Sequence, residues 1–192
     1  MTQNTNSLQK FLKTETRTQE ITSYLKAIPR EKAFYITGFA DGEGSFNISF
    51  RKRDDYLIGW KITAVFNISQ KEEQILAIIK HHLKCGTLRF RKDGVWAYEV
   101  ENKNSIQMQI IPFFHKFPFL SQKKKKDFVR FQKIVSILES HKSTSFSDVL
   151  NILTLLDEIE SKNSRKYTNT EILERASEFW SKNKEKIELK NL

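Results

Sequence analysis

Two acidic side chains set among glycines are the residues of this chain best suited to chemistry. Asp41 and Glu43 alternate with Gly42 and Gly44, directly after the apolar segment 33–40. Carboxylate oxygens are ligands that Mg²⁺ prefers in proteins. The unpaired carbonyl groups at the C-terminus of a helix add partial negative charge. If the apolar segment is a helix that ends at these glycines, the pattern predicts a site for a divalent cation at Glu43.

The segment before the acids has the features of a buried helix. Pro29 precedes it, and proline is well tolerated at the start of a helix. Residues 33–40 carry no charge, so most of the helix circumference is expected to be buried. Gly38, with the small Thr37 and Ala40, would let a second helix approach closely. The alternative is a buried helix whose terminal acids only cap a turn, and the pattern alone leaves both readings open.

Residues 36–44, Ile-Thr-Gly-Phe-Ala-Asp-Gly-Glu-Gly, resemble the nine-residue motif that names the LAGLIDADG homing endonucleases, and Ser45-Phe46 continues the likeness. The resemblance implies a site-specific enzyme that makes Mg²⁺-dependent double-strand breaks in a long pseudo-palindromic DNA target, for intron mobility. The chain is most similar to the single-motif group encoded in organelle introns, so a chloroplast or mitochondrion is the expected location. The family core is αββαββα and would cover about residues 30–140.

The resemblance also implies roles within a site. Glu43 and the main-chain carbonyl of Gly42 would bind Mg²⁺, which would activate water and stabilise the phosphate. Gln70 would position water or hold the hydration shell of the metal. Lys124 would offset the charge that develops on the phosphate. Lys123 is the alternative, because the register across this run of lysines is open.

The sequence departs from the family pattern at one position near Gln70. Some relatives carry an arginine one turn after the glutamine, and this chain has Gln74 there. Lys71 or another lysine would have to supply that charge, or the charge is dispensable.

The chain holds one copy of the motif, whereas cutting both strands of DNA requires two sites. In single-motif relatives two chains pair through their motif helices, so the resemblance implies a C2 homodimer that contacts its partner along residues 31–42. The side chains predicted for this contact are Phe34, Tyr35, Thr37, Gly38, Ala40 and Asp41.

Four later segments alternate between apolar and polar residues, as half-buried strands do. They lie at 45–53, 58–69, 87–92 and 95–101, with a helix expected at 70–84 between the second and the third. In the third segment Leu88 and Phe90 are predicted to face inward, and in the fourth segment Ala97, Glu99 and Glu101 are predicted to face outward. Helices are expected at 104–116, with an interruption at Pro112, and at 124–140, 145–159 and 170–184. The fold class is therefore α+β, with a four-stranded antiparallel sheet, an αββαββα core and additional C-terminal helices.

The outer face of the predicted sheet is polar and basic. Such a sheet can lie along the major groove of DNA, where Arg and Lys read guanine and Asn reads adenine. Taken singly, each of these side chains could equally be ordinary solvated strand surface. The predicted DNA-binding side chains are Asn47, Ser49, Arg51, Arg53, Lys61, Thr63, Asn67, Arg89 and Arg91.

Composition agrees with a nucleic-acid partner. The 192 residues include 33 Lys plus Arg against 23 Asp plus Glu, a net charge of +10. A basic, aromatic-rich chain is typical of folded nucleic-acid binders, although codon bias in an AT-rich genome would raise lysine as well. The single cysteine, Cys85, excludes an intrachain disulfide. Adjacent His81 and His82 point in different directions on a helix and are poor metal co-ligands. No apolar run reaches membrane length, so no membrane partner is expected.

One domain is expected over residues 30–192, with its core at 30–140 and C-terminal helices at 141–186. Residues 1–29 would form an extension that is partly disordered or forms a short helix near 19–28. Two other functions are open on the same fold: a maturase that binds intron RNA, and a DNA-binding protein that has lost catalysis. The acid, glutamine and lysine at the expected places argue against the second.

Overall fold

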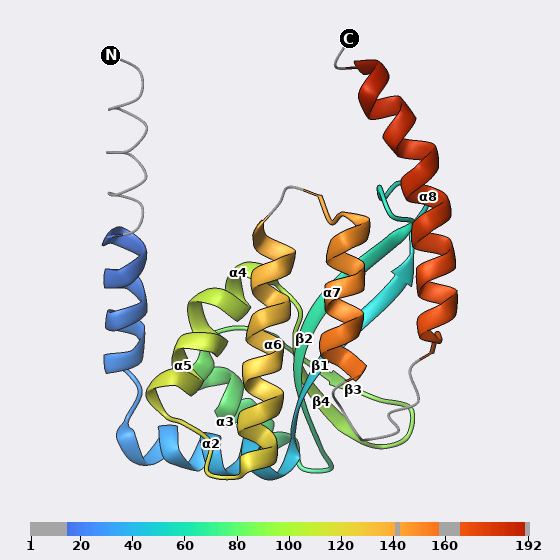
Figure 1. The fold of residues 1–192 in the computed structure, drawn as a ribbon. Helices are drawn as coiled ribbons and strands as arrows, with labels where there is room; N and C mark the ends of the chain where they lie inside the picture. The colour runs from blue at the N-terminus through green and yellow to red at the C-terminus, as the bar shows by residue number, and fades with distance from the viewer. Residues whose placement is uncertain (1–14, 141–142, 158–165, 191–192) are drawn as a thin grey trace, which may run out of the picture. The chain divides into compact units, whose positions relative to one another are not determined.

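The computed structural model describes residues 15–140, 143–157 and 166–190. Its element order confirms the predicted α+β fold with an αββαββα core. The first six core elements are α2 (Arg30–Glu43), β1 (Gly44–Lys52), β2 (Trp60–Gln70), α3 (Glu73–Leu83), β3 (Thr87–Phe90) and β4 (Trp96–Val100). They are followed by α4 (Lys103–Ser105), the π-helix η1 (Ile106–Ile110), α5 (Ile111–Lys116), α6 (Gln122–Ser140), α7 (Phe146–Asp157) and α8 (Asn169–Lys190). The described strands form one sheet in the order β1-β2-β4-β3 (Figure 1).

The chain divides into two compact units. One comprises residues 1–46 and 65–125, and the other comprises residues 47–64 and 126–192. Strands β1 and β2 each begin in one unit and end in the other. The single domain over residues 30–192 stays a prediction.

Helix α2 passes into strand β1 without a loop, and Gly44 makes this possible. Gly44 has extended dihedral angles, φ −74° and ψ 150°, and its N–H donates to the carbonyl of Ala40. A Cβ atom at Gly44 would lie 2.6 Å from that carbonyl oxygen, so a larger residue would force the chain apart. Gly42, which was predicted to break the helix, lies inside it. Glu43 is therefore the last helical residue, as the cation-site prediction required.

Aromatic rings fix the start of β1 in the first unit. The ring of Phe46 lies 5.2 Å from that of Phe66, 5.9 Å from that of Phe114 and 5.8 Å from that of Phe119. Phe66, Phe114 and Phe119 are almost fully buried. Phe119 belongs to the segment that precedes α6, so this cluster connects the end of the motif to the start of that helix.

The predicted interruption at Pro112 appears as a widened turn just before it. The π-helix η1 precedes α5, and Pro112 is the second residue of α5. Because proline has no N–H and its ring clashes with the preceding turn, a regular α-helix cannot run through this point. A π-turn is one way in which a helix absorbs such a break.

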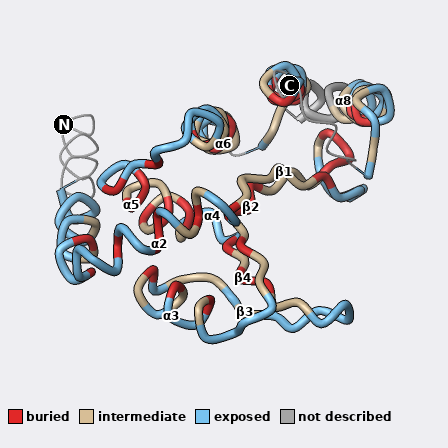
Figure 2. The backbone as a smooth tube through the Cα atoms, turned by 90° about the horizontal axis from the view of Figure 1, so that it is seen from below, coloured by how far each residue is buried: buried red, intermediate tan, exposed pale blue. Residues whose placement is uncertain are grey.

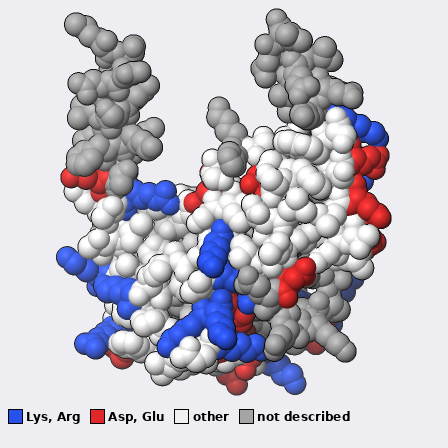
Figure 3. Space-filling model, in the orientation of Figure 1, with Lys and Arg blue, Asp and Glu red and all other residues white. Residues whose placement is uncertain are grey.

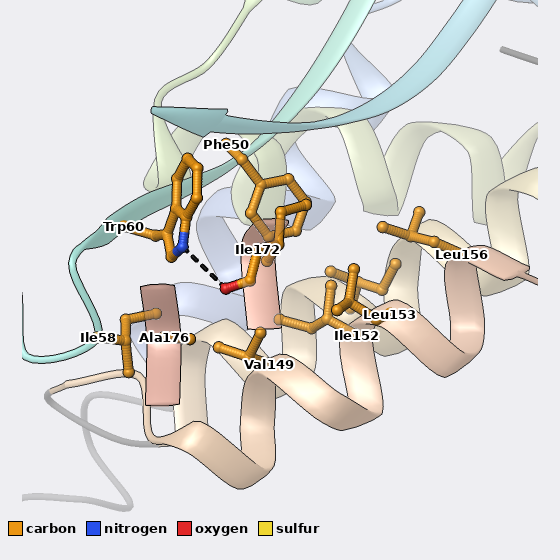
Figure 4. Close-up of a cluster of buried hydrophobic side chains, with 10 residues drawn as sticks. Phe50, Ile58, Trp60, Val149, Ile152, Leu153, Leu156, Ile172 and Ala176 are labelled. Atoms are coloured by element: carbon orange, nitrogen blue, oxygen red, sulfur yellow. Dashed lines mark hydrogen bonds between the residues drawn. The ribbon is translucent and has the colours of Figure 1, made fainter. Parts of the chain in front are cut away.

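Trp60 belongs to the buried apolar cluster of the second unit (Figure 4). It is fully buried, its ring packs 6.1 Å from that of Phe50, and its Nε1–H donates to the carbonyl of Ile172 at 3.1 Å. The other buried members of the cluster are Ile58, Ile134, Val149, Ile152, Leu153, Leu156, Ile172 and Ala176. Strand β2 and helices α6, α7 and α8 all contribute to it, so this cluster holds the C-terminal helices in place.

Replacing Trp60 by alanine is expected to lower the free energy of unfolding by about 3–5 kcal/mol, because a large buried ring leaves a cavity. The Ile172 carbonyl also loses its donor. Urea titration followed by circular dichroism measures the change. Trp96→Ala is the matched control, since that ring is only partly buried. Equal losses in the two variants would contradict the packing described for Trp60.

Strands β2, β3 and β4 are shorter than the alternation predicted, and β1 has the predicted length but ends one residue earlier. Two arginines therefore lie in turns. Arg53 follows β1 and Arg91 follows β3. The N–H of Tyr56 donates to the carbonyl of Arg53 at 3.2 Å, and the N–H of Gly94 donates to that of Arg91 at 3.1 Å. The N–H groups of both arginines still donate across the turns, to the carbonyls of Gly59 and Val95, so each arginine lies where the paired strands pass into the turn.

Two predictions of side-chain direction in the sheet need correction. Phe90, predicted to face the core, is 59% exposed and lies against the ring of Trp96 at 5.1 Å near the exposed tip of the β3–β4 hairpin (Figure 2). Strand β3 is a short edge strand, so its end extends past the buried region. Ala97, predicted to face outward to solvent, is buried. It pairs with Ser69 on one side and Arg89 on the other, and these longer neighbours cover its small side chain.

The N-terminal extension is helical earlier than predicted. Residues 15–26 form a helix, whereas the chain was expected to be loosely ordered up to about residue 20; residues 1–14 lie outside the described part. Arg17 donates to the side chain of Gln107 at 2.9 Å, which ties this helix to η1. The predicted helix at 70–84 begins only at Glu73. Within the described residues, no helix combines the length and apolar character needed to cross a membrane.

Candidate active site

Asp41 ties the C-terminus of α2 to the N-terminus of α6. Its carboxylate accepts hydrogen bonds from the N–H of Leu120 at 3.1 Å, the N–H of Ser121 at 2.9 Å and the Ser121 hydroxyl. Burial alone would raise the pKa of the Asp41 carboxyl. The hydrogen bonds from Ser121 and Leu120 and the charge of Lys124 outweigh burial, so the pKa is lowered. The Asp41 carboxylate therefore holds the C-terminus of α2 against the N-terminus of α6.

The same contact sets the position of Lys124. The hydroxyl oxygen of Ser121 accepts from the N–H of Lys124 at 3.2 Å, which caps α6. The Lys124 ammonium then donates to the carbonyl of Gly44, the residue after Glu43. Among the lysines at 123–126, Lys124 is half-buried and its neighbours are exposed. The geometry therefore favours Lys124 over Lys123. Basic side chains also gather over α6 in Figure 3.

Glu43 is the carboxylate of this region that is available to a cation. It is exposed at the end of α2, and within the described residues it has no hydrogen-bond or ion-pair partner. The described residues contain no group of three or more His, Cys, Asp or Glu side chains able to hold a metal. Mg²⁺ usually keeps several waters and takes one or two carboxylates together with substrate phosphates. A single exposed Glu43 at the end of a helix fits that requirement.

Gln70 is the last residue of β2 and is half-buried. Its side-chain oxygen accepts from the N–H of Lys71 at 2.7 Å. The structure does not show Gln70 in contact with Glu43, so its role at the site stays a prediction.

One face of α2 is exposed, although most of the helix circumference was predicted to be buried. Phe34 and Tyr35 are 47% and 48% exposed, and Gly38 and Gly42 are exposed as well. Outside its own stretch of helix, a Cβ atom on either glycine would meet no atom of the described residues within 4 Å. Glycine inside a helix costs about 1 kcal/mol relative to alanine. Packing within this chain therefore gives no reason for two glycines on that face.

The other side chains predicted for the dimer contact are engaged within the chain. Thr37 and Ala40 are buried. The Thr37 hydroxyl donates to the carbonyl of Phe117 at 3.1 Å. Asp41 is bound to Ser121. This places Phe34, Tyr35 and Gly38 on the exposed face and leaves Thr37, Ala40 and Asp41 to hold α2 to its own chain.

The side chains predicted to bind DNA fall into two groups. In the first unit, Asn67 lies on β2 and Arg89 on β3, while Arg91 lies in the turn after β3. In the second unit, the side chains on β1, on the turn after it and on β2 are Asn47, Ser49, Arg51, Arg53, Lys61 and Thr63.

Acidic partners of these arginines were missed by sequence reasoning. Arg89 bonds to Glu99 at 2.9 and 3.0 Å. Arg53 is paired with Asp55 and Arg91 with Asp93. Glu99 faces outward on β4 in the alternating pattern, so its strand position could have identified it.

Comparison with known proteins agrees with the motif. The family model of the LAGLIDADG endonuclease matches residues 36–135, just over half of the chain. The chain belongs to the LAGLIDADG endonuclease family. The match runs from the motif helix to α6 and so includes Glu43, Gln70 and Lys124.

Individual LAGLIDADG relatives and similar structures support this. The chain is 32% identical over 123 residues to a probable intron-encoded endonuclease 2 of Neurospora crassa, which covers 62% of this chain and 27% of that protein. It is 27% identical over 146 residues to the homing endonuclease I-ApeII of Aeropyrum pernix, covering 72% and 86%. The archaeal intron-encoded homing endonuclease I-Vdi141I, solved with DNA, superposes with a TM-score of 0.67 at 29% identity, covering 77% of this chain and 96% of that one. The chain spans about a quarter of the length of two of the relatives that it matches, 27% and 28%.

Proposed function

We propose that this protein is a site-specific DNA endonuclease that uses Mg²⁺ to make double-strand breaks as a homodimer, in the service of intron mobility. The observation that carries the proposal is the connection Asp41–Ser121–Lys124, which sets a lysine ammonium against the main chain next to the exposed Glu43. Membership of the LAGLIDADG family supports endonuclease chemistry. The DNA in the I-Vdi141I structure supports duplex DNA as the partner.

The chemistry follows from where the groups lie. Glu43 and the carbonyl of Gly42 would hold Mg²⁺, which when bound supplies a Lewis acid and an activated water. Lys124 offsets negative charge on the phosphate and needs no reorganisation, because Ser121 and Gly44 already orient it. Asp41 holds the N-terminus of α6 against α2 and so keeps Lys124 close to Glu43. Gln70 would orient the attacking water from the end of β2.

Dimerisation through α2 would complete the site. One chain brings one Glu43, and cutting two strands requires two. The exposed stripe of Phe34, Tyr35, Gly38 and Gly42 suits close contact with a second copy of the same helix, since glycines let helix backbones approach. A C2 dimer of this kind reads a pseudo-palindromic target.

An organelle is the proposed location, on the evidence of intron-encoded relatives. One is named for ND4 intron 1 of Podospora anserina and another for an intron of cox1 in Schizosaccharomyces pombe. Archaeal intron-encoded proteins share the fold, so location is a separate question from activity.

Lys124→Ala is expected to slow cleavage by about 10²–10³-fold, the usual cost of removing one preorganised group that stabilises transition-state charge. Affinity for DNA should change only a few-fold, since one phosphate contact at most is lost. Single-turnover cleavage and gel-shift titration measure the two effects. Lys125→Ala is the matched control, because that lysine is exposed on the next position of the helix. Similar losses in both variants would show that Lys124 acts only as one of several surface charges.

The proposed function is tested by incubating the protein with a pool of duplexes that span candidate intron-insertion sites, with Mg²⁺ or with EDTA. A discrete double-strand cut that needs Mg²⁺ is the expected result, and its ends identify the target. Tight, salt-sensitive binding without any cut would contradict the endonuclease proposal. Protein-dependent splicing of intron RNA in that case would establish the maturase function instead.

A further inference from the structure

In the first unit, Glu99 lies on the outer face of the sheet, on the strand between two others. Strand β4 is flanked by β2 and β3, and Glu99 pairs with Asn67 on one side and Thr87 on the other. Side chains that face each other across antiparallel strands lie about 4.5–5.5 Å apart at their Cβ atoms. Glu99 is therefore surrounded by polar neighbours on both adjoining strands.

Glu99 also holds Arg89. One terminal nitrogen of the guanidinium, Nη2, donates to both carboxylate oxygens, at 2.9 and 3.0 Å. The other terminal nitrogen and Nε do not take part in this pair, so part of the fork can face a ligand. The Glu99 side chain is 22% exposed and the Arg89 side chain 62% exposed. The acid lies at the base of the pair and the arginine projects from it.

This pair differs from the other two arginine–carboxylate pairs of the predicted DNA-binding set. Arg53–Asp55 and Arg91–Asp93 each join residues two apart around a turn, and their acids are 60% and 50% exposed. Arg89–Glu99 instead crosses between strands whose register is fixed by the ladder. Its geometry is therefore set by the strand pairing, whereas the other two pairs are local to exposed turns.

If Arg89 lies in the major groove of DNA, the Glu99 carboxylate beside it has two physical effects. It repels the phosphates to which a lone arginine would bind in any sequence, and so raises the cost of non-specific binding. It also leaves the guanidinium pre-oriented, and an oriented arginine bonds best to the O6 and N7 atoms of guanine. Both effects increase the difference in affinity between the right and the wrong sequence.

We propose that Glu99 is a specificity-determining residue: it positions Arg89 to read one guanine of the target and keeps that arginine off the phosphate backbone. This inference rests on the proposed function, because it takes duplex DNA as the ligand of the sheet. Glu99 acts through Arg89 and is a positioning residue.

The test selects bound duplexes from a random-sequence DNA pool with full-length protein and sequences them. Wild type is compared with Glu99→Gln, Arg89→Ala and Glu73→Gln. The last is the matched control: it makes the same change of charge at an exposed residue of α3, a helix that packs against β3 and β4. Binding to an unselected pool is titrated for each variant over a range of salt concentrations.

Glu99→Gln and Arg89→Ala are expected to lose preference at the same base pair, a G·C pair in wild type, by about tenfold or more. Glu99→Gln should at the same time bind the unselected pool more tightly than Glu73→Gln, with a salt slope steeper by about 0.9 for the phosphate contact that Arg89 gains. Glu99→Asp should restore part of the preference, because the carboxylate is kept.

Two results would overturn the inference. The first would leave the proposed function intact, and the second would contradict it as well. If wild type enriches a sequence but Glu99→Gln gives the same profile and salt slope as Glu73→Gln, Glu99 does not set specificity and the proposed function is untouched. If wild type enriches no sequence at all, site-specific DNA recognition fails and the inference fails with it.

Discussion

Glu43→Gln should reduce DNA cleavage by at least about 10³-fold, more than the 10–100-fold that loss of an outer-shell partner of a metal costs. The amide keeps the size of the side chain but removes the charge that a divalent cation requires. Glu43 is exposed at the end of α2 and makes no contact within the described residues that the substitution would break. Folding and DNA affinity should therefore be retained. Single-turnover kinetics measure the loss of cleavage, gel-shift titration measures DNA affinity, and thermal unfolding measures stability.

Glu73→Gln is the matched control for this variant too, since it removes one exposed carboxylate from another helix. It should cleave at close to the wild-type rate. Full cleavage by Glu43→Gln would exclude Glu43 as a metal ligand. Loss of binding together with cleavage would mean that the residue serves DNA contact or folding rather than chemistry.

Gly38→Leu should have opposite effects on the isolated chain and on its assembly. Leucine is the better helix former, and a Cβ atom at this position meets no other part of the described residues within 4 Å, so the monomer should gain about 0.5–1 kcal/mol of stability. In the proposed dimer, a larger side chain inserted into a close helix contact would cost about 1–3 kcal/mol, and symmetry would count it twice. The dimer dissociation constant should rise by about 30-fold or more. Sedimentation velocity and thermal unfolding report on the two effects.

Ala77→Leu controls for adding an exposed leucine to a helix, since Ala77 is exposed on α3. It should leave the sedimentation behaviour unchanged. An unchanged dimer in Gly38→Leu would place the subunit contact elsewhere on the molecule. A destabilised monomer would instead mean that Gly38 serves packing within its own chain.

Local chemistry allowed the framework of the site to be predicted from sequence. Glycine at position 44 limits where α2 can end, so the amino-acid pattern alone was enough to place Glu43 at a helix terminus. The alternation of apolar and polar residues located all four strands, since a side chain that faces a core must recur at every second position. Lys124 was found through resemblance and not through a local pattern, because nothing within four consecutive lysines distinguishes one from another.

What the sequence could not predict depends on contacts between distant segments. The bond of Asp41 to Ser121 joins residues 80 apart. Asp41 was predicted to lie in the dimer contact, and in the structure its carboxylate connects α2 to the start of α6 in the same chain. The exposed face of α2 was predicted to be buried, because an uncharged helix looks the same whether its partner is its own chain or a second one. The pairs Arg53–Asp55 and Arg91–Asp93 depend on where the strands end, and strand ends are set by the turn bonds rather than by alternation.

Mixing wild-type protein with Glu43→Gln protein tests most directly whether each chain of a dimer supplies one site. Subunits are exchanged at a series of ratios, and supercoiled plasmid carrying the target is then treated with Mg²⁺. Mixed dimers hold one working Glu43 and should nick one strand, so nicked circles should build up and peak near equal proportions. A linear product that only falls in proportion to the wild-type fraction, with no accumulation of nicked circles at any ratio, would contradict a paired site built from two copies of this chain.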